Sequence, residues 1–306
     1  MRHTVRAAHM TRDDPASSGW DGRDPGRPRA IGLVATDLDG TLLRSDGTVS
    51  PHTRATLSRL AERGIRHVIA TGRPASGCGR YFDALDYRGL AVCGQGAQLY
   101  DAGRGVLRSS VGLNRDAART VLARIAARIG SVELAVVTSG LQGEFVITEG
   151  FSQGDEHELA PFRLASAEQL WSLPIDKVLI RHHSMSDGDL VAVAARCCPP
   201  GLTVTHAGPR IVELLPTGFD KATGLSQVAE AFGIPSREVI AFGDMPNDIP
   251  MLAWAGYAVA MSNGHPELKA VADEVAPNHD EDGVAVVLDR LLGEGACPAR
   301  CGPAER

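Results

Sequence analysis

The sequence lacks the features that mark membrane proteins and nucleic-acid-binding proteins. Its apolar stretches are about as long as a β-strand, whereas a helix that spans a membrane needs roughly 20 apolar residues. No run of Lys and Arg stands out, and 31 basic against 37 acidic residues give a net charge of −6. This balance argues against nucleic acid or an anionic membrane surface as a partner.

Cysteine is scarce, and the first residues do not form a secretory signal. Six cysteines in 306 residues do not make a disulfide framework, and we interpret them as free thiols of a cytoplasmic protein. Cys297 and Cys301 lack the second ligand pair that a metal clip would need. Residues 1–29 have no continuous apolar core, and their Gly, Pro, Asp and Arg content predicts a disordered leader.

From Ile31 onward the chain alternates short apolar strands with helices. The first strand, IGLVATD, shows no polar alternation, which is typical of a parallel strand buried on both faces. Ser50 and Gly64 bound a predicted helix that follows it. Four similar apolar strands indicate an α/β fold with a doubly wound parallel sheet. They are predicted at 65–73, 89–96, 238–244 and 257–261.

Residues 110–215 interrupt this alternation. They contain a predicted helix, RDAARTVLARIAARIG, followed by several β-rich pieces and two further predicted helices, EQLWSLP and GDLVAVAARCC. We interpret this block as an α+β domain inserted into the sheet domain. The expected organisation is a leader at 1–29, a discontinuous core at 30–109 and 216–292, the inserted domain at 110–215, and a tail at 293–306.

Acidic side chains gather where the predicted strands end. Asp37 and Asp39 follow the first strand, Asp244 follows a later strand, and Asp248 lies one helical turn further on. Close carboxylates repel each other unless a cation offsets their charge, and hard oxygen ligands suit Mg²⁺. Beside such a cation, one carboxylate can attack phosphorus to form an aspartyl-phosphate. The neighbouring acid can protonate the leaving oxygen and then activate water.

Three further residues fit phosphoryl transfer. Gly40 permits the tight turn that lets backbone N–H groups face phosphate oxygens. The hydroxyl of Thr71 and the positive charge of Lys221 can hold the transferring group. Each motif alone also has a purely structural interpretation, such as a capping aspartate, a strand-end turn or a solvated lysine.

Four motifs in order resemble those of the haloacid dehalogenase superfamily. They are DLDGTLL at 37–43, TGR at 71–73, Lys221 in ELLPTGFDKATGL, and GDMPNDIPML at 243–252. Their detail is similar to the Cof-type (type IIB, sugar-phosphatase-like) branch of small-molecule phosphatases. Residues 262–288 also resemble the C-terminal signature of that branch.

The resemblance implies a role for each motif residue. Asp37 would be the nucleophile, and Asp39 would be the general acid and base. Asp244 would join Asp37 and the backbone carbonyl of Asp39 in binding Mg²⁺, with Asp248 in support. The phosphate-binding residues implied in the same way are Thr71, Gly72, Lys221 and Asn247.

The resemblance also implies that the inserted block is a type 2 cap, which closes over the phosphate site and selects the leaving group. Its candidate specificity residues are Arg181, His183 and His206, for which a solvated strand end is the simpler interpretation. One departure stands out, because Gln95 occupies a position where relatives usually have Asn. This change can alter a contact near the hinge of the cap.

We therefore expect a cytoplasmic, Mg²⁺-dependent phosphatase that acts on a small-molecule phosphomonoester, with sugar phosphates favoured. A cofactor phosphate, either pyridoxal phosphate or a flavin-pathway intermediate, is the next candidate. A phosphosugar mutase would use the same acid pair, so the motifs are compatible with it. A non-catalytic sensor of metabolite phosphates would have no need of a general acid, and the intact Asp39 argues against it.

Overall fold

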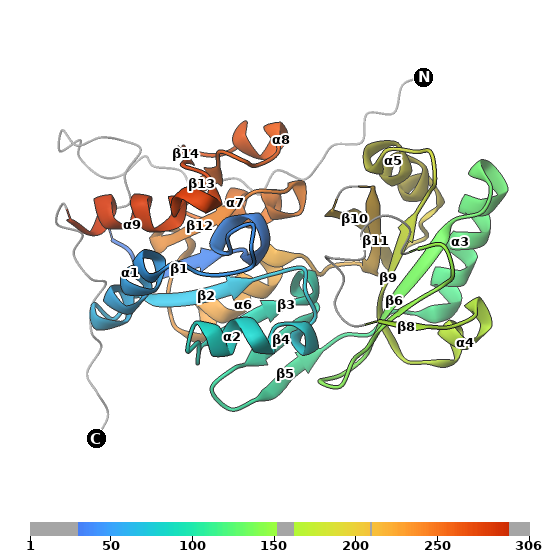
Figure 1. Ribbon diagram of the computed structural model, residues 1–306, viewed down its shortest axis with the longest axis horizontal. Coiled ribbons are helices and arrows are strands. Elements are labelled where there is room, and N and C mark those ends of the chain that lie inside the picture. Colours follow the sequence, from blue (N-terminus) through green and yellow to red (C-terminus); the bar gives the residue numbers. More distant parts are fainter. Residues whose placement is uncertain (1–29, 152–161, 209, 294–306) are drawn as a thin grey trace.

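A computed structural model describes residues 30–151, 162–208 and 210–293 of the chain. The expected leader, and the expected tail beyond residue 293 with Cys297 and Cys301, lie outside the described residues. The described chain forms an eight-stranded sheet and a six-stranded sheet, which lie side by side in Figure 1. Within the described residues, no helix has the length and apolar character needed to cross a bilayer.

The eight-stranded sheet is parallel over six neighbouring strands, with two antiparallel strands at one edge. Its spatial order is β14, β13, β12, β1, β2, β3, β4, β5. In that order the strands span Glu274–Ala276, Tyr257–Met261, Val239–Gly243, Leu33–Thr36, Arg66–Ala70, Leu90–Cys93, Gln98–Asp101 and Val106–Ser110. This arrangement confirms the predicted α/β fold with a parallel-sheet core.

Helices cover both faces of this sheet, because successive side chains of a strand point to opposite sides. On β1, Val34 packs with α1 (Pro51–Glu62), α2 (Gly79–Ala84) and α9 (Gly283–Gly293). Its neighbours Leu33 and Ala35 pack with the helices of the other face. Those helices are α6 (Lys221–Ala231), α7 (Ile249–Trp254) and α8 (Pro266–Lys269). The uniform burial of β1 explains its uninterrupted apolar sequence.

The predicted start of the first helix is confirmed in atomic detail. The Ser50 hydroxyl accepts a hydrogen bond from the backbone N–H of Thr53 at 2.9 Å, and Pro51 occupies the first helical position. Proline is tolerated there because its missing N–H would have no partner within the helix.

The six-stranded sheet lies between β5 and α6 in the chain. Its order is β10, β11, β9, β6, β7, β8, and all neighbours are antiparallel except β7 and β8. In that order the strands span Leu202–Gly208, Ile211–Pro216, Ile175–Arg181, Glu133–Thr138, Phe145–Ile147 and Phe162–Leu164. Helices α3 (Arg115–Ile129), α4 (Ala167–Ser172) and α5 (Asp187–Cys197) contribute to the core on one face.

The turn after β3, η3 (Gly94–Gly96), packs against the start of α6 and joins two parts of the core that are distant in sequence. Gly96 has a φ of +97°, and a Cβ at this position would lie 2.0 Å from the carbonyl oxygen of Asp220. Neither the backbone conformation nor the available space allows another residue there.

We expect Gly96→Ala to lower the free energy of unfolding by about 3 kcal/mol, because backbone strain adds to overpacking. Gly64→Ala is the matched control: Gly64 has a φ of +70°, but a Cβ there would meet nothing within 4 Å. The control should lose only about 1 kcal/mol. Urea unfolding followed by circular dichroism measures both variants, and equal losses would contradict the steric argument.

Candidate active site

The predicted core residues meet at the carboxyl edge of the parallel sheet. Strands β12, β1 and β2 are immediate neighbours, so the loops that follow them lie together. Asp37 follows β1, Thr71 follows β2, and Asp244 follows β12. All three residues are buried. Burial is unusual for an aspartate, so the two aspartates mark this edge as the candidate site.

Lys221 is the positive centre of this site. It is the first residue of α6 and is completely buried. Its Nζ lies 2.9 Å from Oδ1 of Asp37 and 2.6 Å from Oδ1 of Asp248. The other oxygen of Asp248 accepts hydrogen bonds of 3.1 Å from the backbone N–H groups of Asp244 and Met245. Asp248 therefore orients both the lysine and the loop after β12.

Carboxylate oxygens of Asp37, Asp244 and Asp248 lie within 4.8 Å of one another. Burial raises the pKa of Asp37 well above its ordinary value; Lys221 opposes this shift, and the neighbouring carboxylates add to it. Burial, followed by repulsion from Asp248, raises the pKa of Asp244 to about 7. A divalent cation among these oxygens would offset their charge, so the donor set fits a hard ion such as Mg²⁺.

The turn η1 (Leu38–Leu42) places Asp244 against the loop of Asp37. The Thr41 hydroxyl donates a hydrogen bond of 3.1 Å to Oδ1 of Asp244. Gly40 has a φ of +70°, and a Cβ there would lie 2.3 Å from the second oxygen of Asp244. Glycine at position 40 therefore allows both the turn and the close approach of the carboxylate.

Asp39 differs from the buried acids in its exposure and in its partner. Its side chain is 50% exposed and accepts two hydrogen bonds of 2.7 Å from Nε and Nη2 of Arg73. The guanidinium of Arg73 also lies 4.9 Å from the centre of the Tyr81 ring. The predicted site set does not include Arg73. The signal that identifies it is its planar fork two residues after Thr71, at the same sheet edge as Asp39.

Gln95 connects two of the predicted phosphate-binding residues. Its Oε1 accepts a hydrogen bond of 3.1 Å from Nδ2 of Asn247. A Cβ on Gly72 would lie 2.7 Å from Nε2 of Gln95, so the glycine makes room for this amide. Thr71 lies beside them, and its hydroxyl accepts a hydrogen bond of 3.1 Å from the backbone N–H of Arg73.

Two buried charges of the six-stranded sheet reach this edge. Nζ of Lys177, on β9, donates a hydrogen bond of 2.8 Å to the carbonyl oxygen of Gly72 and forms an ion pair with Glu213 of β11. The second carboxylate oxygen of Glu213 accepts a hydrogen bond of 3.2 Å from Nε2 of Gln95. Sequence reasoning missed both charged residues. Their signal is a charge in the middle of an apolar strand, in IDKVLI and RIVELLP.

The structure places two of the three predicted specificity residues at the far end of β9. Nη1 of Arg181, which is buried, donates a hydrogen bond of 3.2 Å to the carbonyl oxygen of Phe151. His183 is exposed, and its ring centre lies 4.3 Å from that of His182. These contacts lie within the six-stranded part of the chain.

His206, the third predicted specificity residue, lies on the helix-covered face of the six-stranded sheet. It pairs in register with Val212, which belongs to the core beneath the helices. Its Nδ1 lies 2.9 Å from a carboxylate oxygen of Asp187, at the start of α5. Glu213, the next residue after Val212, points to the opposite face. The structure thus places His206 and Glu213 on opposite faces of the six-stranded sheet.

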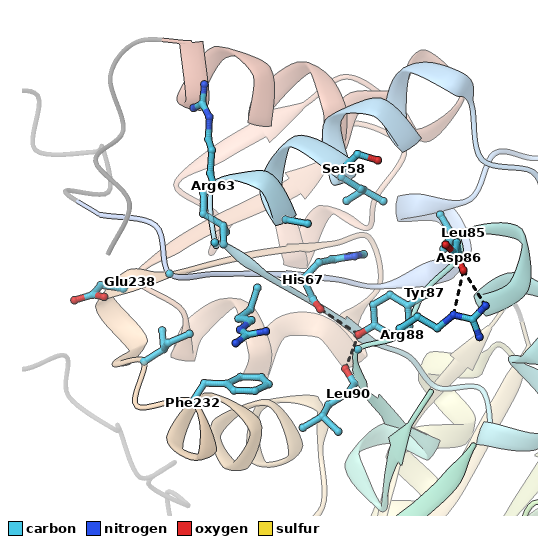
Figure 2. A pocket seen from close by; sticks show the side chains of 18 of the residues that line it. Ser58, Arg63, His67, Leu85, Asp86, Tyr87, Arg88, Leu90, Phe232 and Glu238 are labelled. Carbon is cyan, nitrogen blue, oxygen red and sulfur yellow. Dashed lines mark hydrogen bonds and ion pairs between the residues drawn. The ribbon is translucent and has the colours of Figure 1, made fainter. Parts of the chain in front are cut away.

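A cavity of about 1530 Å³ lies at the amino edge of the parallel sheet, away from the acids. Figure 2 shows it between the starts of β2 and β3 and the end of α6, with His67, Leu90 and Phe232 in its wall. Nε2 of His67 lies 2.9 Å from the hydroxyl oxygen of Thr36. The cavity is larger than any space that a small phosphate needs, but the acid cluster is absent from its lining.

The comparisons with known proteins agree with this geometry. The family model for haloacid dehalogenase-like hydrolases matches residues 34–288. The chain belongs to this family. It is accordingly a phosphoric monoester hydrolase, and the resemblance inferred from the four motifs is confirmed.

Several curated relatives of this haloacid dehalogenase-like hydrolase carry phosphatase names. The 5-amino-6-(5-phospho-D-ribitylamino)uracil phosphatase YitU of Bacillus subtilis is 28% identical over 84% of this chain and 96% of its own length. The HMP-PP phosphatase of Serratia proteamaculans is 29% identical over 85% and 95%. The crystal structure of SMU.1108c from Streptococcus mutans matches with a TM-score of 0.77 at 25% identity, over 87% of this chain and all of that one.

We expect His67 to make stability depend on pH. Burial lowers the pKa of His67 from 6.5 to about 4, so the unfolded chain binds this proton more readily than the folded protein. The contribution of the neutral His67 ring to the free energy of unfolding is complete above pH 6.5 and is lost as the pH falls toward 4. The loss should be about 2 kcal/mol, because the ring borders a cavity and is only partly shielded from water. His67→Gln should reduce the drop in the free energy of unfolding between pH 7 and pH 4.5, measured by urea unfolding at both pH values. Parallel curves for both proteins would refute the assignment.

Proposed function

We propose that this phosphatase uses Mg²⁺ and an aspartyl-phosphate on Asp37 to hydrolyse small phosphorylated metabolites. The observation that carries this proposal is the buried cluster of Asp37, Asp244 and Asp248 around Lys221 at the carboxyl edge of the sheet. Isolated carboxylates rarely stay buried together unless a charged partner or a charged substrate offsets them.

Asp37, Asp244 and the backbone carbonyl of Asp39 would hold the cation. Both oxygens of Asp248 are engaged with Lys221 and with backbone N–H groups, so this residue would orient the loop. A bound Mg²⁺ would screen the negative charge of the carboxylates and of the phosphate.

The residues of the chain divide the chemistry into two displacements at phosphorus. In the first, a carboxylate oxygen of Asp37 bonds to phosphorus while the bond to the leaving oxygen breaks. Asp39, which is paired with Arg73 in the structure, would leave this pair and take up a proton before it gives that proton to the leaving oxygen. In the second, Asp39 takes a proton from water as the water attacks phosphorus and frees the Asp37 carboxylate. Thr71, Gly72 and Lys221 would hold the phosphate oxygens, and Asn247 completes the set that the resemblance implies.

We propose that residues 110–215 act as a cap over a core of 30–109 and 216–292. The contact of Lys177 with Gly72, and that of Glu213 with Gln95, support this arrangement. Strand β10 also packs against the turn η5 (Pro246–Asp248), which belongs to the acidic loop. The face that carries Lys177 and Glu213 is therefore the part of the cap that would meet the leaving group.

For the substrate we propose a sugar phosphate, and the names of the relatives favour a second candidate. The compound named for YitU carries its phosphate on a ribityl chain, a polyol attached to a heterocycle. A flavin-pathway phosphate of this kind would present hydroxyl groups to the cap, as a sugar phosphate would. Release of phosphate from a panel of hexose phosphates, pyridoxal phosphate and the ribityl compound would rank the candidates by kcat/KM.

We expect Asp37→Asn to lower kcat by about a thousandfold or more, because the amide is a poor nucleophile toward phosphorus. The fold should persist, since Lys221 keeps its contact with Asp248. Phosphate release from a hexose monophosphate and far-UV circular dichroism are the two measurements. Turnover near the wild-type rate would exclude Asp37 as the nucleophile. In the wild-type protein, conversion of the hexose monophosphate to a positional isomer without phosphate release would instead indicate a mutase.

We expect EDTA to stop hydrolysis and added Mg²⁺ to restore it, because the acid cluster carries more negative charge than Lys221 can offset. Asp244→Asn should raise the Mg²⁺ concentration needed for half-maximal activity by about tenfold or more, since it removes a charged ligand. Hydrolysis that is indifferent to chelation would remove the cation from the mechanism.

A further inference from the structure

A row of polar side chains connects the six-stranded sheet with the acidic loop. It begins at Glu213, which is buried on β11 and held in an ion pair by Lys177. A carboxylate in such a pair is ionised and can only accept hydrogen bonds. Whatever faces Glu213 must therefore present an N–H or an O–H group.

Gln95 meets this requirement with its side-chain nitrogen. Nε2 donates to Glu213 at 3.2 Å, so Oε1 lies at the other end of the amide and accepts from Nδ2 of Asn247 at 3.1 Å. Because an amide has one donor end and one acceptor end, the charge on Glu213 determines the orientation of Gln95, and Gln95 determines that of Asn247.

The result is an unpartnered acceptor next to the acid cluster. Oδ1 of Asn247 is buried and has no hydrogen-bond partner among the described residues. Asn247 immediately precedes Asp248, whose carboxylate contacts Lys221. A buried polar atom without a partner costs about 1–3 kcal/mol, so this position calls for a hydrogen-bond donor from outside the chain.

The backbone of Gln95 indicates that the amide is held there against a conformational preference. Its φ of +58° and ψ of 30° are left-handed, a region that asparagine adopts more readily than glutamine. Glutamine has one more methylene group than asparagine. That extra length allows the amide to span from Asn247 to Glu213.

We propose that Gln95 and Glu213 are positioning residues, which turn the Asn247 amide so that its oxygen accepts a hydrogen bond from an O–H donor. The donor is either a water on the bound cation or a hydroxyl group of the substrate. The oxygens of a phosphate dianion carry no proton and cannot fill this role. The assignment differs from the phosphate contact that the resemblance implies for Asn247, and it rests on the proposed function.

Gln95→Asn tests the proposal, because it shortens the amide while suiting the left-handed backbone. Gln98→Asn is the matched control, since Gln98 also bridges the two sheets. Its Nε2 donates to Asp176 at 2.6 Å, and its Oε1 accepts from the backbone N–H of Ala75 at 2.9 Å. Three measurements apply to both variants. They are the Kd for Mg²⁺ by calorimetry on the free protein, kcat/KM for a hexose phosphate and for p-nitrophenyl phosphate, and the thermal unfolding midpoint.

If the donor is a water on the cation, Gln95→Asn should weaken Mg²⁺ binding about tenfold and lower both kcat/KM values alike. If the donor is a substrate hydroxyl, the variant should lower kcat/KM about tenfold for the hexose phosphate and leave p-nitrophenyl phosphate unchanged. Gln98→Asn should do neither. A Gln95→Asn protein that behaves like Gln98→Asn would overturn the proposal.

A separate experiment tests whether Gln95 acts through the Asn247 amide. In an Asn247→Leu background, which removes the acceptor, Gln95→Asn should cause no further loss. An undiminished loss there would show that Gln95 acts elsewhere and would overturn the assignment. Should Gln95→Asn fail to fold, Glu213→Gln serves instead, because a neutral amide lets Gln95 turn either way. A wild-type protein that neither binds Mg²⁺ nor hydrolyses any phosphate would refute the proposed function itself.

Discussion

The buried ammonium of Lys221 is the interaction on which the rest of the site depends. Asp37 and Asp248 both lie within ion-pair distance of it, and Asp248 in turn holds the loop of Asp244. Without this positive charge, three carboxylates would share a poorly solvated space and repel one another. The same contact ties the start of α6 to the loop after β1, although the six-stranded sheet separates them in the sequence. One charge therefore stabilises the site and the return of the chain to its core.

The part of the site that follows from strand ends could be predicted from the sequence. Asp37, Thr71 and Asp244 each come directly after a strand that ends in buried residues, and parallel strands end at one edge of a sheet. Local patterns of this kind carry both the α/β fold and the clustering of the acids. The role of Ser50 as the N-terminal capping residue of the first helix could be predicted for the same reason, because its hydrogen-bond partner Thr53 is only three residues away.

Contacts between distant segments could not be predicted in this way. Arg73 and Asp39 are adjacent in space only because β1 and β2 are neighbours in a particular register. The sequence does not determine which face of the six-stranded sheet each side chain occupies, because a shift of one residue in strand register exchanges the two faces. His206 and Glu213 both occupy strands near the acidic loop, yet they point to opposite faces. Periodicity alone gave no reason to prefer the glutamate over the histidine.

The buried charges at the junction of the two sheets also suit a junction that opens. Lys177 and Glu213 form an ion pair with each other. Lys177 also contacts the carbonyl oxygen of Gly72, and Glu213 contacts the amide of Gln95, and these contacts take the place of water. When such an interface separates, its charges recover their hydration, which offsets much of the lost attraction. An apolar interface of the same area would regain nothing from water and would stay closed. Charged residues here would therefore let the two sheets part and rejoin with a small difference in free energy, as the cap that we propose requires.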